Sequence, residues 1–160
     1  MKTILYITLI SLIVLSCSNT GKKLADNSPK NNSKLDETLA KKLGADAYGM
    51  KTYVIAFLKK GPNRFKDSIT SAKLQRAHLD NIIKLAEEGT LVLAGPFLEE
   101  GELRGIYIFD VKTIEEAKKL TETDPAIQAG SLEMDLKLWY GSAALLQIND
   151  IHQKIAKIKI

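Results

Sequence analysis

The chain of 160 residues contains a single cysteine, Cys17, and only two histidines, His78 and His152. One cysteine excludes a disulfide framework within the chain and any metal site built from several cysteines. Two histidines far apart in the sequence also argue against a dedicated transition-metal site. The sequence therefore predicts no metal and no cofactor, and a fold held together by packing alone.

The sequence also lacks the usual marks of nucleotide and nucleic-acid binding. It has no phosphate-binding glycine loop, because Gly101 and Gly105 fit turns. The formal net charge is only +4, and the basic residues are not interleaved with aromatic residues as in a nucleic-acid footprint. Much of the basic excess lies at the two ends of the chain, where it favours either an anionic membrane surface or plain solubility.

The chain begins with a positive residue, Lys2, followed by a mostly apolar run over residues 4–15. This run is too short for a stable membrane span, which needs roughly 20 apolar residues. The pattern predicts a secretion signal over residues 1–16 that is cut before Cys17. The alternatives are an ordinary N-terminal anchor and a signal peptide with an incidental cysteine.

The residues Val14-Leu15-Ser16-Cys17 resemble the lipobox of bacterial lipoproteins, although Leu15 is looser than the commonest pattern. The resemblance implies that Cys17 is the lipid attachment site and anchors the chain to a membrane of the bacterial cell envelope. Ser18 stands where many lipoproteins retained in the inner membrane carry aspartate. The implied location in a Gram-negative host is therefore the outer membrane.

The rest of the chain divides into three segments by composition. Residues 17–50 are rich in Asn, Ser and Lys and predict a mostly disordered tether, with a short helix over 36–43. Residues 51–147 predict one compact domain. Residues 148–160 carry isoleucines at a heptad-like spacing and predict an amphipathic tail helix that docks on the domain or on a second copy.

Strand and helix signals alternate in the predicted domain in the order βαββαβ. Runs of β-branched and aromatic residues predict strands over 51–58, 90–94, 104–110 and 132–139. Helical spacing predicts a first helix over 69–88 that ends at Gly89, and the capping box at Thr113–Glu116 begins a second. This order is that of the ferredoxin-like α+β fold.

The first and third predicted strands are apolar on both faces. Because two helices cover only one face of such a sheet, the other face would be a large exposed apolar patch. The fourth strand alternates, with Leu132, Met134, Leu136 and Leu138 facing inward, which suits a sheet edge. The sequence therefore predicts a homodimer in which a second copy packs sheet to sheet.

Several short motifs in this domain resemble the YCII-related (YciI-like) family. They are Leu74–Leu79, Gly89, Ala94–Pro96, Thr113–Ala117, Asp124-Pro125, Ala129-Gly130 and a final strand ending in Trp139. That family resembles muconolactone isomerases in fold, so the resemblance implies a dimeric α+β barrel built from two ferredoxin-like subunits. Most members of the family have no established reaction.

The resemblance also implies an active-site pair, His78 and Asp124. An imidazole beside a carboxylate can take and return a proton near neutral pH, which suits elimination, isomerisation or lactone-type chemistry on a small organic acid. Arg76 lies two residues from His78 and would reach a substrate carboxylate from the helix edge. Ala126 replaces a residue that is usually large in the family, which alters the shape of the pocket.

The residues by themselves leave structural alternatives open. His78 shares a helical stripe with Leu74 and Ile82, so it also fits a half-buried histidine at the flank of the core. Asp124 precedes Pro125, an arrangement typical of a helix N-cap with proline at the first helical position.

Two functions from different classes remain. One is an envelope enzyme that uses His78 and Asp124 for proton transfer. The other is a non-catalytic, lipid-tethered module that binds a small molecule or assembles with a partner.

Tyr53, Tyr107 and Trp139 are interpreted as core or pocket wall, and His152 as a solvated residue.

Overall fold

The computed structural model describes residues 34–158. The predicted signal peptide, the lipid attachment at Cys17 and residues 17–33 of the predicted tether lie outside the described residues. Within residues 34–158, no helix is both long enough and apolar enough to span a membrane.

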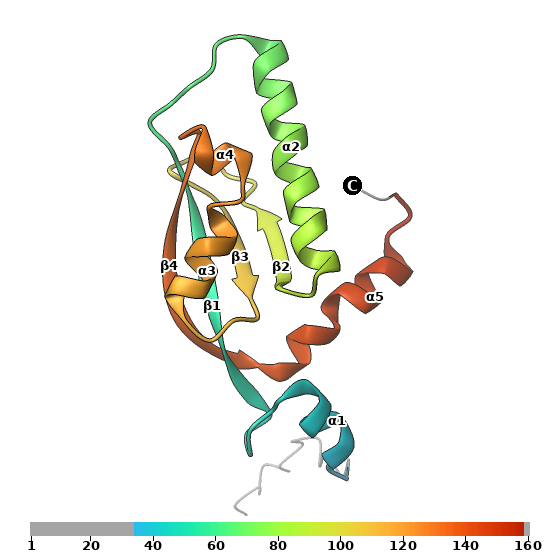
Figure 1. The fold of residues 1–160 in the computed structure, drawn as a ribbon. Coiled ribbons are helices and arrows are strands. Elements are labelled where there is room, and N and C mark those ends of the chain that lie inside the picture. The colour runs from blue at the N-terminus through green and yellow to red at the C-terminus, as the bar shows by residue number, and fades with distance from the viewer. Residues whose placement is uncertain (1–33, 159–160) are drawn as a thin grey trace, which may run out of the picture. The chain divides into compact units, whose positions relative to one another are not determined.

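The described chain forms one four-stranded sheet with helices α2, α3 and α4 on the same face (Figure 1). The elements are α1 (Glu37–Leu43), β1 (Met50–Lys60), α2 (Ser68–Glu87), β2 (Leu91–Pro96), β3 (Leu103–Phe109), α3 (Ile114–Thr121), α4 (Pro125–Gln128), β4 (Leu132–Ser142), the 3-10 helix η1 (Ala143–Gln147) and α5 (Ile148–Ile155). Apart from the short α4, the order from β1 to β4 is βαββαβ. The predicted ferredoxin-like α+β fold is confirmed.

The strands lie in the order β2-β3-β1-β4, and all neighbouring pairs are antiparallel. β1 is central and pairs along its whole length with β4, from Met50 opposite Ser142 to Lys60 opposite Leu132. β4 is an edge strand, as the alternation of its residues predicts. One β-bulge interrupts the pairing of β1 with β3, between Leu58 and Lys59.

The larger hydrophobic cluster lies between the sheet and the helices. β1 contributes Val54, Ala56 and Leu58, and the helices contribute Leu85 and Ala117. These side chains are at most 4% exposed. Burial of this face fixes the register of β1, because a one-residue slip would turn its apolar side chains to the opposite face.

A second cluster covers part of the opposite face of the sheet. Tyr53, Val92 and Ile108 are buried there, and Leu145 and Leu146 of η1 pack against them. The sequence predicts that this face needs a cover other than the two predicted helices. Part of that cover is η1 of the same chain. The cover is incomplete, since Phe57 is half-buried and Trp139 is 37% exposed.

Two apolar residues that the sequence predicts to face inward, Leu138 of the fourth strand and Ile114 of the second helix, are exposed, although Leu138 lies opposite Val54 on the predicted face. Leu138 is 58% exposed, because it lies on an edge strand that has a neighbouring strand on one side only. Ile114 is 36% exposed, because it is the first residue of α3, where the helix face is not yet covered. In the tail, α5 ends at Ile155, and Ile151 is 53% exposed.

Candidate active site

Helix α2 supplies His78 from its buried face. Asp67, the residue before α2, caps the helix by accepting hydrogen bonds from the backbone of the first turn. Gly89, with a φ of 75°, follows the end of α2. Three residues of the helix are buried, namely His78, Asn81 and Leu85. Two polar residues among three on a core-facing stripe are unusual and indicate a site rather than a plain core.

The partner of His78 is Asp124, which is fully buried and directly precedes α4. Asp124 Oδ1 accepts the backbone N–H of Ala126 at 2.8 Å, so the carboxylate is the N-cap that its position before Pro125 predicts. Its other oxygen, Oδ2, lies 2.7 Å from His78 Nδ1. One carboxylate therefore both caps α4 and contacts His78.

The contact with Asp124 decides which imidazole nitrogen is basic. An ionised carboxylate only accepts hydrogen bonds, so Nδ1 of His78 is the donor. In the neutral imidazole, Nε2 then carries the lone pair. The hydroxyl of Tyr107 lies 3.3 Å from Nε2 and is the donor to it.

Tyr107 also belongs to the candidate site, whereas the sequence suggests only that it is part of the core or of a pocket wall. Its ring stacks on the imidazole, with centroids 6.2 Å apart, and meets Phe109 edge to face at 5.8 Å. Burial raises the pKa of Tyr107, and the negative charge of Asp124 raises it further. The hydroxyl is therefore protonated at neutral pH and acts as a donor.

Asn81 is a second buried polar residue that the sequence analysis missed. Its Oδ1 accepts a hydrogen bond from Thr123 Oγ1 at 3.0 Å, next to Asp124 in the chain. Its Nδ2 has no partner among the residues that the structure describes. α2 is thus joined to the turn before α4 at two points, through His78 and through Asn81.

Arg76 lies apart from these residues. Its Nε and Nη2 contact Asp80 Oδ1 at 3.0 and 2.9 Å, and its side chain is 51% exposed. It lines neither of the two pockets described below. Substrate binding by Arg76 stays a prediction.

The model of the YCII-related domain family matches residues 53–139, which is more than half of the chain. The chain belongs to the YCII-related family. The match confirms the resemblance seen in the sequence motifs, and it spans the four strands and both residues of the His78–Asp124 pair.

One solved structure similar to this YCII-related protein is 5-chloro-2-hydroxyhydroquinone dehydrochlorinase from Burkholderia phenoliruptrix AC1100, in complex with 2,5-dihydroxybenzoquinone. The two share 20% sequence identity, and the alignment covers 56% of this chain and 93% of the other, with a TM-score of 0.41. A likeness this distant does not transfer a reaction. No curated protein matches the chain.

A small polar pocket of the YCII-related domain, with a volume of about 230 Å³, is lined by residues of α2 and α4 near the His78–Asp124 pair, but by neither member of the pair itself. Its wall includes Leu74, one helical turn before His78, and Ala126, whose N–H binds Asp124. Its polar and charged lining comes from Arg64, Ser71, Gln75, Arg104 and Ser131. We call it the two-arginine pocket.

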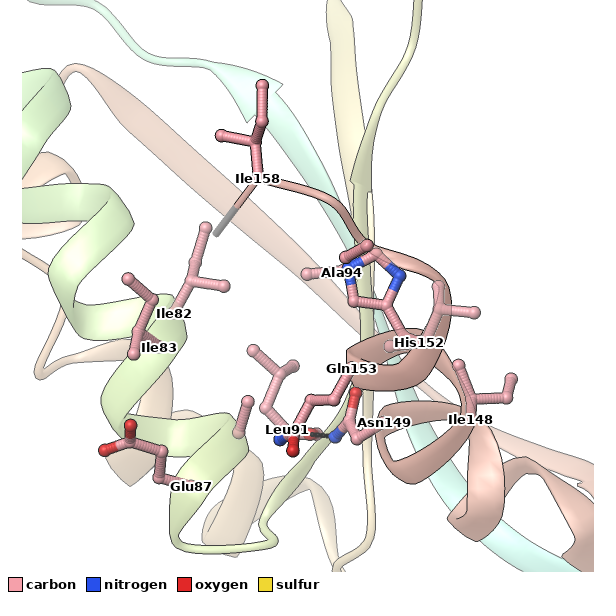
Figure 2. Close-up of a pocket in the computed structure, with 13 residues that line it drawn as sticks. Ile82, Ile83, Glu87, Leu91, Ala94, Ile148, Asn149, His152, Gln153 and Ile158 are labelled. Atoms are coloured by element: carbon pink, nitrogen blue, oxygen red, sulfur yellow. Dashed lines mark hydrogen bonds between the residues drawn. The ribbon is translucent and has the colours of Figure 1, made fainter. Parts of the chain in front are cut away.

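A larger pocket, of about 680 Å³, lies away from this pair, between α2, β2 and α5 (Figure 2). Ile82 and Ile83 of α2 lie across from Asn149, Gln153 and His152 of α5, and Asn149 Nδ2 donates to Leu91 O at 3.1 Å. His152 is exposed, at the wall of this pocket. The lining of this pocket is mostly apolar.

In the described part of the chain, no three side chains of His, Cys, Asp or Glu are grouped closely enough to hold a metal ion. The titratable groups that contact the His78 imidazole are the Asp124 carboxylate and the Tyr107 phenol.

Proposed function

We propose that the YCII-related domain is an acid–base enzyme acting on a small organic acid, with His78 as the base. The observation that carries the proposal is the 2.7 Å contact between His78 Nδ1 and the fully buried Asp124. Such a carboxylate orients the ring, fixes Nε2 as the basic nitrogen and stabilises the imidazolium that forms when Nε2 takes a proton.

The chemistry that fits this arrangement is removal of a proton from carbon next to a carbonyl group. The C–H bond breaks, the proton moves to Nε2 of His78, and the electron pair stays on the substrate as an enolate. Return of the proton to a different carbon completes an isomerisation. In an elimination, the electron pair of the enolate instead forms a carbon–carbon double bond while the leaving group departs with the electrons of its own bond to the neighbouring carbon, after which His78 releases its proton to water.

Tyr107 determines how the proton reaches His78. Its hydroxyl occupies the direction of Nε2 at 3.3 Å, a long contact of the kind that apo sites often show. The hydroxyl either turns aside when substrate binds or relays the proton, giving its own hydrogen to Nε2 as it takes one from the substrate. A phenol whose pKa is raised, as in Tyr107, suits both, because it is not a phenolate at neutral pH.

The test is deuterium exchange by full-length protein in D2O, followed by proton NMR, with 2-oxo acids and γ-lactones as probes. We expect loss of the signal of the carbon-bound hydrogen next to the carbonyl, at a rate proportional to protein concentration. His78→Gln and Asp124→Asn should abolish it. Exchange that persists in both variants, or no exchange with any probe by a well-folded protein, would count against the proposal.

One observation favours a second function, a non-catalytic binding module. Both ring nitrogens of His78 are occupied, and the residue is only 8% exposed. In that case the pair only joins α2 to α4, and the domain binds a ligand without changing it. The two functions differ in the exchange activity of the parent protein, which a binding module lacks and which His78→Gln abolishes in an enzyme.

We propose further that the YCII-related domain works as a homodimer. The supporting observation is the partly open face of the sheet, where Phe57 is half-buried and Trp139 is 37% exposed. Exposed apolar surface of this kind favours association, here with the same face of a second copy of the chain.

We propose that the protein is a lipoprotein of the bacterial cell envelope, anchored through Cys17 and located at the outer membrane in a Gram-negative host. The support is the sequence pattern of residues 1–18 alone. Labelling of cells with radioactive palmitate tests it. We expect a labelled band of the protein that is absent for Cys17→Ala, whereas equal labelling of both proteins would refute acylation at this residue.

A further inference from the structure

The two-arginine pocket has an unusual charge composition for a cavity of its size. Two of its lining residues, Arg64 and Arg104, are cationic, and none is acidic. Among the described residues, neither guanidinium group has a carboxylate within ion-pair distance; Arg76, by contrast, is paired with Asp80. Two unneutralised positive charges beside one cavity repel each other and favour a ligand that brings negative charge.

Arg104 lines this pocket because of the β-bulge. In regular pairing, residues two apart share a face, so Arg104 would lie on the face of Ile106, away from the helices. The register instead passes from Leu58 opposite Gly105 to Lys59 opposite Leu103, which leaves Arg104 as the extra residue. Bulges re-aim side chains in this way near functional sites. As a result, Arg104 shares a cavity with Leu74 and Gln75 of α2.

Arg64 lies in a loop that is fastened on both sides. Before it, Asn63 donates its backbone N–H to Gly130 O and its side-chain Nδ2 to Ala129 O, both at 2.9 Å. After it, Phe65 O accepts a hydrogen bond from Ser71 Oγ at 3.2 Å. The backbone that carries Arg64 is therefore held at the pocket, while its exposed side chain is free to meet a ligand, which lowers the entropy cost of ordering the loop on binding.

The remaining lining suits a small, polar ligand. Gln75 and Ser131 add neutral hydrogen-bonding groups beside the arginines. The volume of about 230 Å³ is below the roughly 300–1,000 Å³ of sites for drug-sized ligands. The planar guanidinium fork of arginine matches a carboxylate with two parallel hydrogen bonds.

From these observations we infer that the two-arginine pocket binds a small dicarboxylate, with Arg64 and Arg104 as the residues that hold its two carboxylates. The inference rests on the proposed function in one respect, since it takes the ligand of the pocket to be the substrate of the nearby His78–Asp124 pair. The sequence predicts Arg76 as the substrate-binding residue. The inference assigns this role to Arg64 and Arg104 instead.

Calorimetric titration of the full-length protein tests the inference with three probes that share one carbon skeleton. Fumarate carries two carboxylates, crotonate carries one, and crotonamide carries none. We expect fumarate to bind at least tenfold more tightly than crotonate, and crotonamide to show no measurable binding. Binding of crotonamide as tight as that of fumarate, or no binding of fumarate at millimolar concentration, would overturn the inference.

Single substitutions then locate the site. Arg64→Met and Arg104→Met should each weaken fumarate binding by about 10- to 100-fold, since each removes charged hydrogen bonds. Arg104→Lys should give an intermediate loss, because lysine keeps the charge but not the fork. Lys84→Met removes an equal charge from the exposed side of α2 and should change binding less than threefold. Unchanged binding in both arginine variants would refute the assignment.

Three further titrations distinguish this inference from binding by Arg76, from a phosphoryl ligand and from the catalytic proposal. Arg76→Met should bind fumarate like the parent, whereas a large loss would restore the sequence-based assignment. Inorganic phosphate should bind more weakly than fumarate, and tighter binding of phosphate would replace the dicarboxylate by a phosphoryl ligand. His78→Gln should keep fumarate binding even if it has no exchange activity, so failure of the catalytic proposal and failure of the pocket assignment give different results.

Discussion

At the scale of single residues, the site depends on one carboxylate that has no contact with solvent. Asp124 is 0% exposed, and its two oxygens accept hydrogen bonds from Ala126 N–H and from His78. A buried charge is tolerated only while its partners are present, and the removal of one partner leaves it without compensation. His78 is therefore expected to matter for folding as well as for the proposed proton transfer.

We predict that His78→Phe lowers the free energy of unfolding by about 3 kcal/mol near pH 7, because it leaves the Asp124 carboxylate buried with one partner. Asp124→Asn introduced into this variant should recover part of the loss, since it removes the charge. Urea denaturation measures both. The control is His152→Phe at the exposed second histidine, which should stay within about 0.5 kcal/mol of the parent. An equally small change for His78→Phe would contradict the description of the pair.

The sequence was sufficient for some residues of the site and not for others. His78 and Asp124 belong to short motifs, and Asp124 also carries a local signal as a cap before Pro125. Tyr107 carries no such signal, because a strand tyrosine looks the same whether its hydroxyl meets solvent or meets a histidine 29 residues away. Asn81 was missed for a related reason, since its partner Thr123 is 42 residues distant.

At the scale of elements, the loop between β1 and α2 and the turn between α4 and β4 hold each other in place. Gly61 lies so close to this turn that a Cβ there would be 2.3 Å from Gly130 O. Gly130 itself has a φ of 66°, which favours glycine. Asn63 adds the hydrogen bonds to Ala129 and Gly130 that keep the neighbouring Arg64 at the two-arginine pocket.

We predict that Asn63→Ala weakens fumarate binding several-fold and lowers the free energy of unfolding by about 1 kcal/mol, the usual worth of one hydrogen bond. The matched control is Thr113→Ala, which removes the capping box of α3 at a similar cost of about 1 kcal/mol. The control lies outside the pocket and should not change binding. Equal losses of fumarate binding in the two variants would show that the loss follows from lower stability and not from a changed position of Arg64.

The elements that the sequence predicted best are those with local signals at their ends. The capping box at Thr113 and the glycine after α2 are present as predicted, and the bounds of α2 differ by one residue at each end. The bulge at Arg104 was not predicted, because it is a property of two paired strands rather than of one. The packing of Leu145 and Leu146 on the sheet is likewise a contact between distant segments.

At the scale of the whole molecule, the face of the sheet opposite the helices is only partly covered. η1 covers the end around Tyr53, while Phe57 is half-buried and Trp139, next to Tyr53 on the edge strand, is 37% exposed. A second copy packing sheet to sheet would cover the remainder.

We predict that sedimentation of the full-length protein at micromolar concentration gives a dimer, and that Trp139→Glu shifts it toward monomer, because a charge is then buried at the interface. Ile69→Glu is the control. It changes a residue that is 65% exposed at the start of α2, away from the open face, and should leave the dimer intact. A parent protein that sediments as a monomer would refute the dimer.

The pH dependence of stability is a further property of the whole molecule. Burial raises the pKa of Tyr53 to about 12, with the Asp110 carboxylate as a smaller cause, and the pKa of Tyr107 is also raised. The folded protein thus holds these protons more tightly than the unfolded chain does. Their contribution to stability is complete below about pH 10, the ordinary tyrosine pKa, and is lost as pH rises through the folded values.

We therefore expect the free energy of unfolding, measured in urea, to fall between pH 10 and pH 12. Tyr53→Phe and Tyr107→Phe should each reduce the slope of this fall, because each removes one such proton. Tyr48→Phe, at a side chain that is 86% exposed, is the control and should not change the slope. A slope that is the same in all three variants would contradict the assignment to the buried tyrosines.

If the two-arginine pocket and the His78–Asp124 pair form one site, a ligand in the pocket changes the surroundings of the imidazole. Proton NMR of the imidazole Cε1–H signals during a fumarate titration detects this change, because the chain has only two histidines and His152→Gln assigns them. We expect the His78 signal to move along the binding curve obtained by calorimetry, the His152 signal to stay in place, and Arg104→Met to abolish the movement. Fumarate binding that leaves the His78 signal in place would contradict a single site.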